Sequence, residues 1–322
     1  MIPAKDEMTI GFAHAAYRFM ERFELRNTGI KCFEVRTRED IDRRMGEADV
    51  LVISGLWHNG LIDLAGKLRF IQAISSGTDF FDLKRLQAKG VRLANAQGVA
   101  ARAVSEHAMA LIMALIRRLP EARDNQVKHF WRGMMGDLSR REDELSGKTL
   151  LIVGLGMIGD RLAHLGKAFD MNVIGVRRDP AQGKGHADEI HALSALGSLL
   201  PRADFVALTC PLTPATEKLI NAETLGLMKP SAYLINVARG RCVDEPALID
   251  ALRTGRIAGA GIDVAVEEPL AADSPLWDLR NALITPHTGG DTHRYEDSVL
   301  DMLQDNLGRL WRNETKLYNE II

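Results

Sequence analysis

The stretch Leu150-Leu151-Ile152-Val153-Gly154-Leu155-Gly156-Met157-Ile158-Gly159 decides how this sequence folds. Its four leading apolar residues predict a buried strand, and the glycines that follow fit the pattern GxGxxG. Gly154, Gly156 and Gly159 permit a tight turn, close approach of the backbone to a pyrophosphate, and close packing of the next helix on the strand. That helix begins at about Met157 and Ile158, so its N-terminus faces the phosphates. The stretch therefore predicts a dinucleotide-binding site.

Short apolar runs of the same kind recur along the whole chain, separated by stretches with helical spacing. Each has the length and near-continuous apolarity of a strand buried on both faces of a parallel sheet. The pattern predicts two doubly wound α/β domains with parallel sheets, a Rossmann cofactor domain and a smaller flavodoxin-like substrate domain. The expected strands of the smaller domain are 8–13, 31–35, 50–53, 70–74 and 91–94; those of the cofactor domain are 149–153, 172–176, 204–209, 232–237, 258–264 and 282–285.

Two long helices are predicted to connect these domains. One spans 103–119 and leaves the first domain, and an amphipathic helix over 295–311 returns to it. We therefore expect residues 1–98 and 289–322 to form the substrate-binding (catalytic) domain, and 99–288 the dinucleotide-binding domain. The active site is expected in the cleft between them, because ligands of open parallel sheets bind beyond the carboxyl ends of the strands.

Composition excludes several classes of protein. The length of 322 residues suits two globular domains. The net charge of −2 gives no sign of the positive surface that nucleic-acid binding requires. The most apolar run, 108–116, is far shorter than the roughly 20 residues that cross a bilayer. The charged amino terminus is unlike a signal peptide, so we expect a cytoplasmic protein that does not bind membranes. Three scattered cysteines predict neither disulfides nor a zinc cluster, and no metal is expected.

The ends of the predicted strands supply the cofactor contacts. Arg177 and Arg178 follow the second strand, where NAD-binding folds place an acidic residue for the ribose hydroxyl. Two guanidinium groups there suit the 2′-phosphate of NADP, so NADP(H) is expected in preference to NAD(H). The alternative is that both arginines are solvated and Asp179 binds the ribose of NAD. The turns after the third and fourth strands are expected to line the cofactor with Cys210, Pro211, Val237 and Ala238.

Polar residues also follow the fourth, fifth and sixth strands, at the same edge. Arg239 can hold a carboxylate and polarise the adjacent carbonyl. Asp263 and Glu268 follow the fifth strand and His287 the sixth; a carboxylate beside a histidine fixes its tautomer and favours imidazolium, a proton donor. We take these strand ends as the catalytic edge, with Asp263 either holding the nicotinamide or tuning the histidine–glutamate pair.

These motifs, in this order and spacing, resemble the D-isomer-specific 2-hydroxyacid dehydrogenases over nearly the whole chain. The glycine motif, 236–240, 263–269 and Pro286-His287 carry the likeness. The resemblance implies that Arg239 binds the substrate, that His287 is the acid/base and that Glu268 is its partner. Family members usually have an aromatic residue at Ala265 and often a histidine at Thr209, so this chain departs from them at two positions near the site.

The same resemblance assigns residues of the first domain to the substrate. The backbone N–H groups of Ser76 and Gly77 would hold its carboxylate, and Trp57 resembles the substrate-facing loop of the glyoxylate/hydroxypyruvate reductase branch, which often uses NADPH. The family is usually dimeric, so a homodimer is expected, with Trp131 in a dimer arm. The implied reaction is reduction of a small 2-keto acid to the D-2-hydroxy acid.

Two alternatives remain. One is a short phosphoglycerate-type dehydrogenase, weakened because the chain leaves no room for the regulatory domain often attached there. The other is a non-catalytic dinucleotide sensor that binds a partner protein, which no basic patch or disordered extension supports. A formate-type enzyme normally carries glutamine in place of Glu268, so the glutamate argues against formate oxidation.

Overall fold

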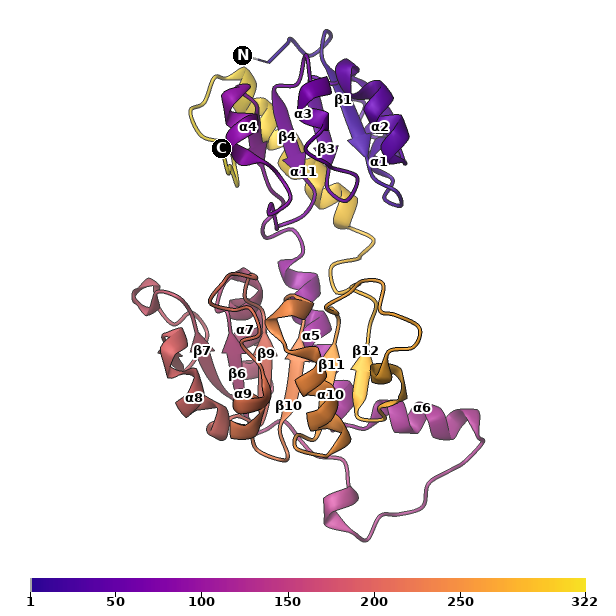
Figure 1. The fold of residues 1–322 in the computed structure, drawn as a ribbon, viewed down its shortest axis with the longest axis vertical. Coiled ribbons are helices and arrows are strands. Elements are labelled where there is room, and N and C mark those ends of the chain that lie inside the picture. Colours follow the sequence, from indigo (N-terminus) through magenta and orange to yellow (C-terminus); the bar gives the residue numbers. More distant parts are fainter. Residues whose placement is uncertain (1) are drawn as a thin grey trace. The chain divides into compact units, whose positions relative to one another are not determined.

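Residues 2–322 are described by a computed structural model, and they form two compact units. Unit 1 comprises the chain through Ala100 together with Thr292–Ile322, and unit 2 is Ala101–Asp291. Each unit contains one parallel sheet with helices packed on it (Figure 1). The predicted class of two parallel-sheet α/β domains is confirmed. No helix within residues 2–322 combines the length and the apolarity that a membrane crossing requires.

Unit 1 has a five-stranded sheet in the order β2-β1-β3-β4-β5. This is the flavodoxin-like doubly wound order, in which the chain reverses direction across the sheet after the second strand. The strands are β1 (Thr9–Ala13), β2 (Lys31–Val35), β3 (Val50–Ile53), β4 (Phe70–Ala73) and β5 (Arg92–Ala94); the helices are α1 (Phe19–Glu24), α2 (Arg38–Arg44), α3 (Leu61–Leu64), α4 (Leu83–Ala88) and α11 (Tyr295–Trp311).

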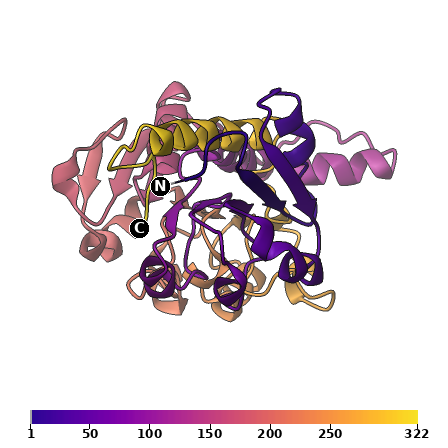
Figure 2. The ribbon, with the colours of Figure 1, turned by 90° about the horizontal axis from the view of Figure 1, so that it is seen from above.

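The two faces of this sheet are buried by different helices. On one face, Phe19 and Phe23 of α1 and Leu303 of α11 pack with Ile10 and Phe12 of β1. The other face packs against α2, α3 and α4. Figure 2 shows α11, in yellow, lying along its face of the unit 1 sheet. The last helix of the chain thus completes the core begun by the first strand.

Unit 2 has a seven-stranded sheet in the order β12-β11-β10-β9-β6-β7-β8. Counted from β6, the order 3-2-1-4-5-6 extended by one strand is that of the dinucleotide-binding Rossmann fold. The strands are β6 (Thr149–Val153), β7 (Asn172–Val176), β8 (Glu189–His191), β9 (Phe205–Leu208), β10 (Tyr233–Asn236), β11 (Gly259–Ile262) and β12 (Ala282–Ile284); the helices are α5 (Ala101–Ile116), α6 (Leu119–Val127), α7 (Met157–Ala168), α8 (Leu196–Leu199), α9 (Ala222–Leu227) and α10 (Glu245–Arg253).

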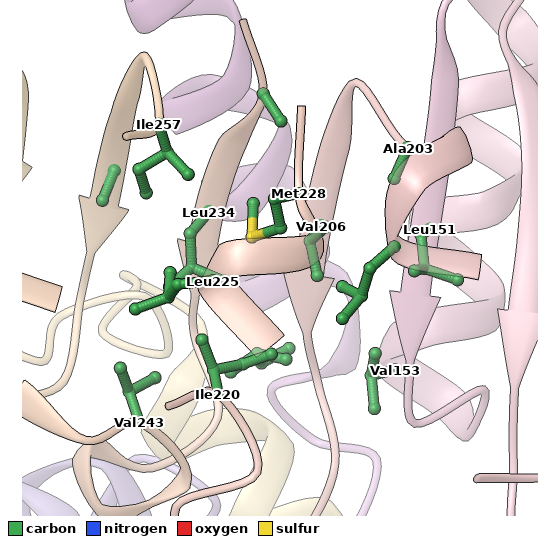
Figure 3. Close-up of a cluster of buried hydrophobic side chains, with 14 of the residues drawn as sticks. Leu151, Val153, Ala203, Val206, Ile220, Leu225, Met228, Leu234, Val243 and Ile257 are labelled. Carbon is green, nitrogen blue, oxygen red and sulfur yellow. The ribbon is translucent and has the colours of Figure 1, made fainter. Parts of the chain in front are cut away.

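Alternate residues of each strand in unit 2 enter two separate cores. Leu151 and Val153 of β6 belong to the same buried cluster as Leu225 of α9, which Figure 3 shows in close-up. Leu150 and Ile152 face the opposite side, where α5 and α7 pack. The central strands β6, β9 and β10 are buried on both faces and therefore read as continuous apolar runs, which is why they are recognisable in the sequence.

Two elements differ from the sequence prediction. β8 was not predicted, because Glu189–His191 is a short, polar segment at the sheet edge and carries no apolar run. The helix predicted over 103–119 spans Ala101–Ile116 instead. Arg118 has a φ of 51°, in the left-handed region that interrupts a right-handed helix, and α6 begins at Leu119.

Candidate active site

The glycine loop after β6 is shaped by backbone contacts that only glycine permits. A Cβ on Gly154, whose φ is +107°, would lie 2.5 Å from the backbone nitrogen of Cys210. A Cβ on Gly159 would lie 2.4 Å from the Gly154 carbonyl oxygen, so α7 packs directly on the loop. A Cβ on Gly156 would meet nothing within 4 Å, which leaves its face of the loop open. The first and third glycines therefore build the turn, and the second leaves room for a ligand.

The open face of this loop fits a pyrophosphate. Within α7 the first backbone bond runs from the N–H of Asp160 to the Gly156 oxygen at 2.8 Å. The N–H groups of Met157, Ile158 and Gly159 therefore have no acceptor inside the helix and point toward its N-terminal end. The positive end of the helix dipole adds to their attraction for an anion. A dinucleotide cofactor would be held here by its phosphates.

At the end of β7 the two arginines have different surroundings. Arg177 donates to the Gly183 carbonyl oxygen at 3.0 Å and to Oε1 of Gln182 at 2.6 Å. Arg178 is exposed and makes no hydrogen bond or ion pair within residues 2–322. Asp179 accepts the N–H of Ala181 at 3.1 Å, which turns its carboxylate into its own loop. The guanidinium of Arg178, rather than the carboxylate of Asp179, is therefore available to a ligand at this strand end.

The turns after β9 and β10 present mostly backbone and small side chains. Cys210 is buried against Gly154, and a hydrogen bond with Cys242, together with burial, raises the pKa of its thiol. Pro211 is exposed beside it, while Val237 and Ala238 are buried. Thr209, where the family often has histidine, donates to the Gly154 oxygen at 2.8 Å and so stabilises the glycine loop.

Arg239 lies in a turn that is fixed on both sides. Asn236 accepts the N–H of Ala238 at 3.1 Å and donates to the Arg239 carbonyl oxygen at 3.0 Å. On the other side, a Cβ on Gly240 would lie 1.9 Å from the carbonyl oxygen of Ala265. The Arg239 residue is exposed, and its guanidinium donates to the Ala238 oxygen at 2.7 Å. The turn after β10 is thus packed directly against the segment that leads to Glu268.

His287 and Glu268 form a hydrogen-bonded pair. Nδ1 of His287 lies 2.7 Å from Oε2 of Glu268, and Oε1 of Glu268 accepts the N–H of Ala265 at 3.1 Å. Both oxygens of the carboxylate are therefore occupied, which fixes its orientation. No hydrogen bond within residues 2–322 engages Nε2 of His287, and about half of the side chain is exposed. The imidazole is oriented by one nitrogen and free to act with the other.

Asp263 holds the backbone turn that carries His287. Its Oδ1 accepts from Oγ1 of Thr285 at 2.7 Å and from the N–H of Thr288, and its Oδ2 accepts the N–H of Gly289. Burial raises the pKa of this carboxyl, but the bonds from His107, Thr285 and Gly289 outweigh burial and leave the pKa below its usual range. A buried, ionised Asp263 is therefore committed to this turn.

Thr285 and His107 are site residues that the sequence pattern does not single out. Nε2 of His107, on α5, lies 2.9 Å from Oγ1 of Thr285 and 3.3 Å from Oδ1 of Asp263. Thr285 stands at the end of a predicted strand, but nothing in the local pattern indicates that a helix 178 residues away in sequence supplies its partner.

The predicted substrate residues of unit 1 fall into two kinds. The Ser76 carbonyl oxygen accepts from the side-chain amide of Asn95 at 2.7 Å, and the Gly77 carbonyl oxygen accepts from the Ser75 hydroxyl at 2.8 Å. The N–H groups of Ser76 and Gly77 donate to no acceptor within residues 2–322, so they are available to an anion. Trp57 is 4% exposed and packs against Phe81, with its indole N–H on Asn59. The structure gives Trp57 a packing role, and its contact with substrate stays a prediction.

Comparisons with known proteins agree with this geometry. The family model described as the D-isomer specific 2-hydroxyacid dehydrogenase NAD binding domain matches residues 109–289. A D-3-phosphoglycerate dehydrogenase from Methanocaldococcus jannaschii is 36% identical over 86% of this chain, but the match spans only 52% of that relative's length. A glyoxylate/hydroxypyruvate reductase B from Pectobacterium carotovorum is 39% identical over 78% of both chains. Among solved structures, an NADPH-dependent glyoxylate/hydroxypyruvate reductase from Sinorhizobium meliloti has a TM-score of 0.81 at 26% identity, covering 98% of this chain and 97% of that one.

Proposed function

The chain belongs to the D-isomer-specific 2-hydroxyacid dehydrogenase family, and from this premise we propose that it reduces a small 2-keto acid to the D-2-hydroxy acid with NADPH. Glyoxylate and hydroxypyruvate are the substrates we expect. The observation that carries the proposal is the hydrogen bond of 2.7 Å between His287 and Glu268 at the same sheet edge as the glycine loop. Unit 2 is proposed to bind the dinucleotide, and unit 1 to supply contacts to the substrate.

The proposal assigns a task to each residue of the site, and Arg239 has two, since it binds the carboxylate and polarises the carbonyl. Arg239 and the N–H groups of Ser76 and Gly77 bind the substrate carboxylate. Nε2 of His287 protonates the carbonyl oxygen, while Glu268 holds Nδ1 and stabilises the imidazolium. The bound nicotinamide cofactor supplies the hydride. Asp263 acts on the turn that carries His287 rather than on a ligand, since its carboxylate is occupied by internal donors.

The preference for NADPH rests on the end of β7. Asp179 is turned into its own loop, and Arg178 is free to bind a phosphate. The Sinorhizobium structure of similar fold is described as NADPH-dependent, which supports the same choice. A free carboxylate would be needed at this position to favour the ribose hydroxyl of NADH.

Oxidation of 3-phosphoglycerate is the second candidate, favoured by the 36% identity to the Methanocaldococcus enzyme. Initial rates with glyoxylate, hydroxypyruvate and 3-phosphohydroxypyruvate, each with NADH and with NADPH, separate the two candidates. The proposal expects the highest kcat/KM with an unphosphorylated acid and NADPH. A clear preference for the phosphorylated acid would establish the second candidate. If no 2-keto acid were turned over, both candidate activities would be wrong.

We also propose that the protein is a homodimer joined through residues 130–138, in the segment that projects from unit 2 after α6 (Figure 1). Phe130, Trp131, Met134 and Leu138 in this segment are 59–105% exposed, an unusual amount of apolar surface for a monomer. A cavity of about 550 Å³ lies between α6 and the same segment, lined partly by Arg118, Trp131 and Arg132. Light scattering of the wild type and of Trp131→Ala with Met134→Ala tests this, because a dimer should dissociate in the variant.

A further inference from the structure

The loop between β7 and β8 is tied to the first turn of α7. The carboxylate of Asp160, which directly follows the glycine motif, accepts the backbone N–H of His186 at 2.8 Å through Oδ1. Its Oδ2 lies 2.9 Å from Nδ1 of the same histidine. Both oxygens of one side chain therefore bind one residue of the loop, a geometry that fixes the position and the direction of the loop backbone at that point.

The fit at this anchor is close. A Cβ added to Gly185, whose φ is +52°, would lie 1.9 Å from Oδ1 of Asp160. Only glycine allows the loop to approach the carboxylate in this conformation. The ring of His186 also packs edge-on against His164 of α7, with ring centroids 4.9 Å apart. The anchor thus involves the backbone and the side chain of the loop together.

The other end of the loop is held by Arg177, whose guanidinium donates to Gly183 and Gln182. Between Arg177 and His186 the loop exposes Arg178, which has no described partner, and Lys184, whose ammonium donates to the Asp188 carbonyl oxygen at 3.4 Å. Of its neighbouring carboxylates, Asp179 accepts the N–H of Ala181 and Asp160 accepts from His186. The loop therefore presents exposed cations on an anchored backbone, at the strand end where a Rossmann fold binds the adenosine ribose.

We propose that Asp160 is a positioning residue for the 2′-phosphate of NADP(H): it anchors the 178–186 loop and thereby holds its cations in place for the phosphate. The inference rests on the proposed NADPH preference and deepens it. Asp160 itself carries a negative charge, and a free carboxylate near a phosphate weakens its binding. By charge alone, removal of this acidic side chain would strengthen phosphate binding. The proposal predicts the opposite, that removal weakens phosphate binding, because the loop must then be ordered when the phosphate binds.

The test is isothermal titration of the full chain with adenosine 2′,5′-bisphosphate and with adenosine 5′-monophosphate, which differ only in the 2′-phosphate. The wild type should bind the bisphosphate more tightly. Asp160→Ala should weaken bisphosphate binding by about tenfold and leave the monophosphate within about twofold. Asp160→Asn, which keeps an acceptor for the His186 N–H, should fall between. Asp250→Ala on α10, an exposed side chain with no described hydrogen bond, is the control and should change neither affinity.

A second variant keeps the charge and disturbs only the fit. Gly185→Ala leaves Asp160 intact but pushes the loop from it, so it should also weaken bisphosphate binding, with circular dichroism confirming that both variants are folded. Unchanged or tighter bisphosphate binding in Asp160→Ala would overturn the inference while leaving the NADPH preference standing. Equal binding of the two probes by the wild type would overturn the NADPH preference, and the inference with it.

Discussion

The backbone N–H of His287 donates to the carbonyl oxygen of Asp263 at 2.8 Å, while the carboxylate of Asp263 accepts from the two residues that come after His287. This one residue therefore fixes the turn on both sides of the histidine. His287 itself has a φ of 54°, a conformation that is unfavourable for a residue with a Cβ. The contacts of Asp263 maintain this backbone strain and so set the direction of the imidazole.

Asp263→Asn should therefore destabilise the protein and lower turnover. The amide cannot accept from all the donors that now surround the buried carboxylate, and each unsatisfied buried donor costs about 1–3 kcal/mol. Urea unfolding measures the loss of stability, and kcat measures the misplaced histidine. Asp273→Asn, an exposed side chain without a described partner, should change neither quantity.

The stability difference between the wild type and Asp263→Asn should depend on pH. The folded pKa of Asp263 lies below the ordinary 3.8, so ionisation stabilises the fold fully above about pH 4. That contribution is lost as the pH falls through the folded value, and the two unfolding free energies should converge there. If the unfolding free energies of the two proteins fell equally between pH 5 and pH 3, Asp263 would not be ionised in the folded wild type.

Substitution at the histidine–glutamate pair should affect turnover far more than stability, because both side chains are partly exposed. His287→Ala removes the proton donor, and loss of general acid catalysis typically costs ~10²–10⁴-fold in kcat. Glu268→Gln should cost less, since the amide oxygen can still accept from Ala265. Glu267→Gln, beside it in the chain and exposed, is the control. Near-normal turnover of His287→Ala would remove it as the acid.

Gly240→Ala tests the contact between the arginine turn and the segment before Glu268. The new methyl group would overlap the Ala265 carbonyl, so the two segments must separate. We expect a destabilisation of about 1–3 kcal/mol, typical of overpacking, and a fall in kcat/KM. At Gly226, in helix α9, an added Cβ meets nothing within 4 Å. Gly226→Ala should leave activity unchanged and slightly raise the melting temperature.

The sequence predicts the parts of the site that depend on strand ends. Short apolar runs locate β6, β10 and β12, and the residues directly after these parallel strands lie at the same edge of the sheet. Contacts between distant segments leave no such pattern. The bond from His107 to Thr285 and the approach of Gly240 to Ala265 depend on how helices and loops pack in three dimensions, and periodicity carries no information about that.

Cofactor choice should change when the arginines after β7 are replaced. Arg178→Ala removes one exposed cation, and the double variant with Arg177→Ala also frees the loop at Gly183. The KM for NADPH should rise by about tenfold or more in the double variant, while that for NADH changes little. Arg253→Ala, exposed on α10, serves as the control. An unchanged ratio of the two KM values would refute the assignment of NADP(H).

Arg239 and Arg241 provide a matched pair for testing the carboxylate site. Both are exposed in the same turn, but Arg241 is bound to Glu217 at 2.6 Å, whereas the one hydrogen-bond partner of the Arg239 guanidinium among residues 2–322 is the Ala238 carbonyl oxygen. Arg239→Ala should raise the KM for the keto acid and lower kcat together, because the guanidinium binds the carboxylate and polarises the carbonyl that accepts hydride. Arg239→Lys should recover little, since an ammonium cannot reproduce the planar fork. Arg241→Ala should alter neither constant. If the two alanine variants behaved alike, the effect would be one of net charge at this edge, and Arg239 would lose its proposed role.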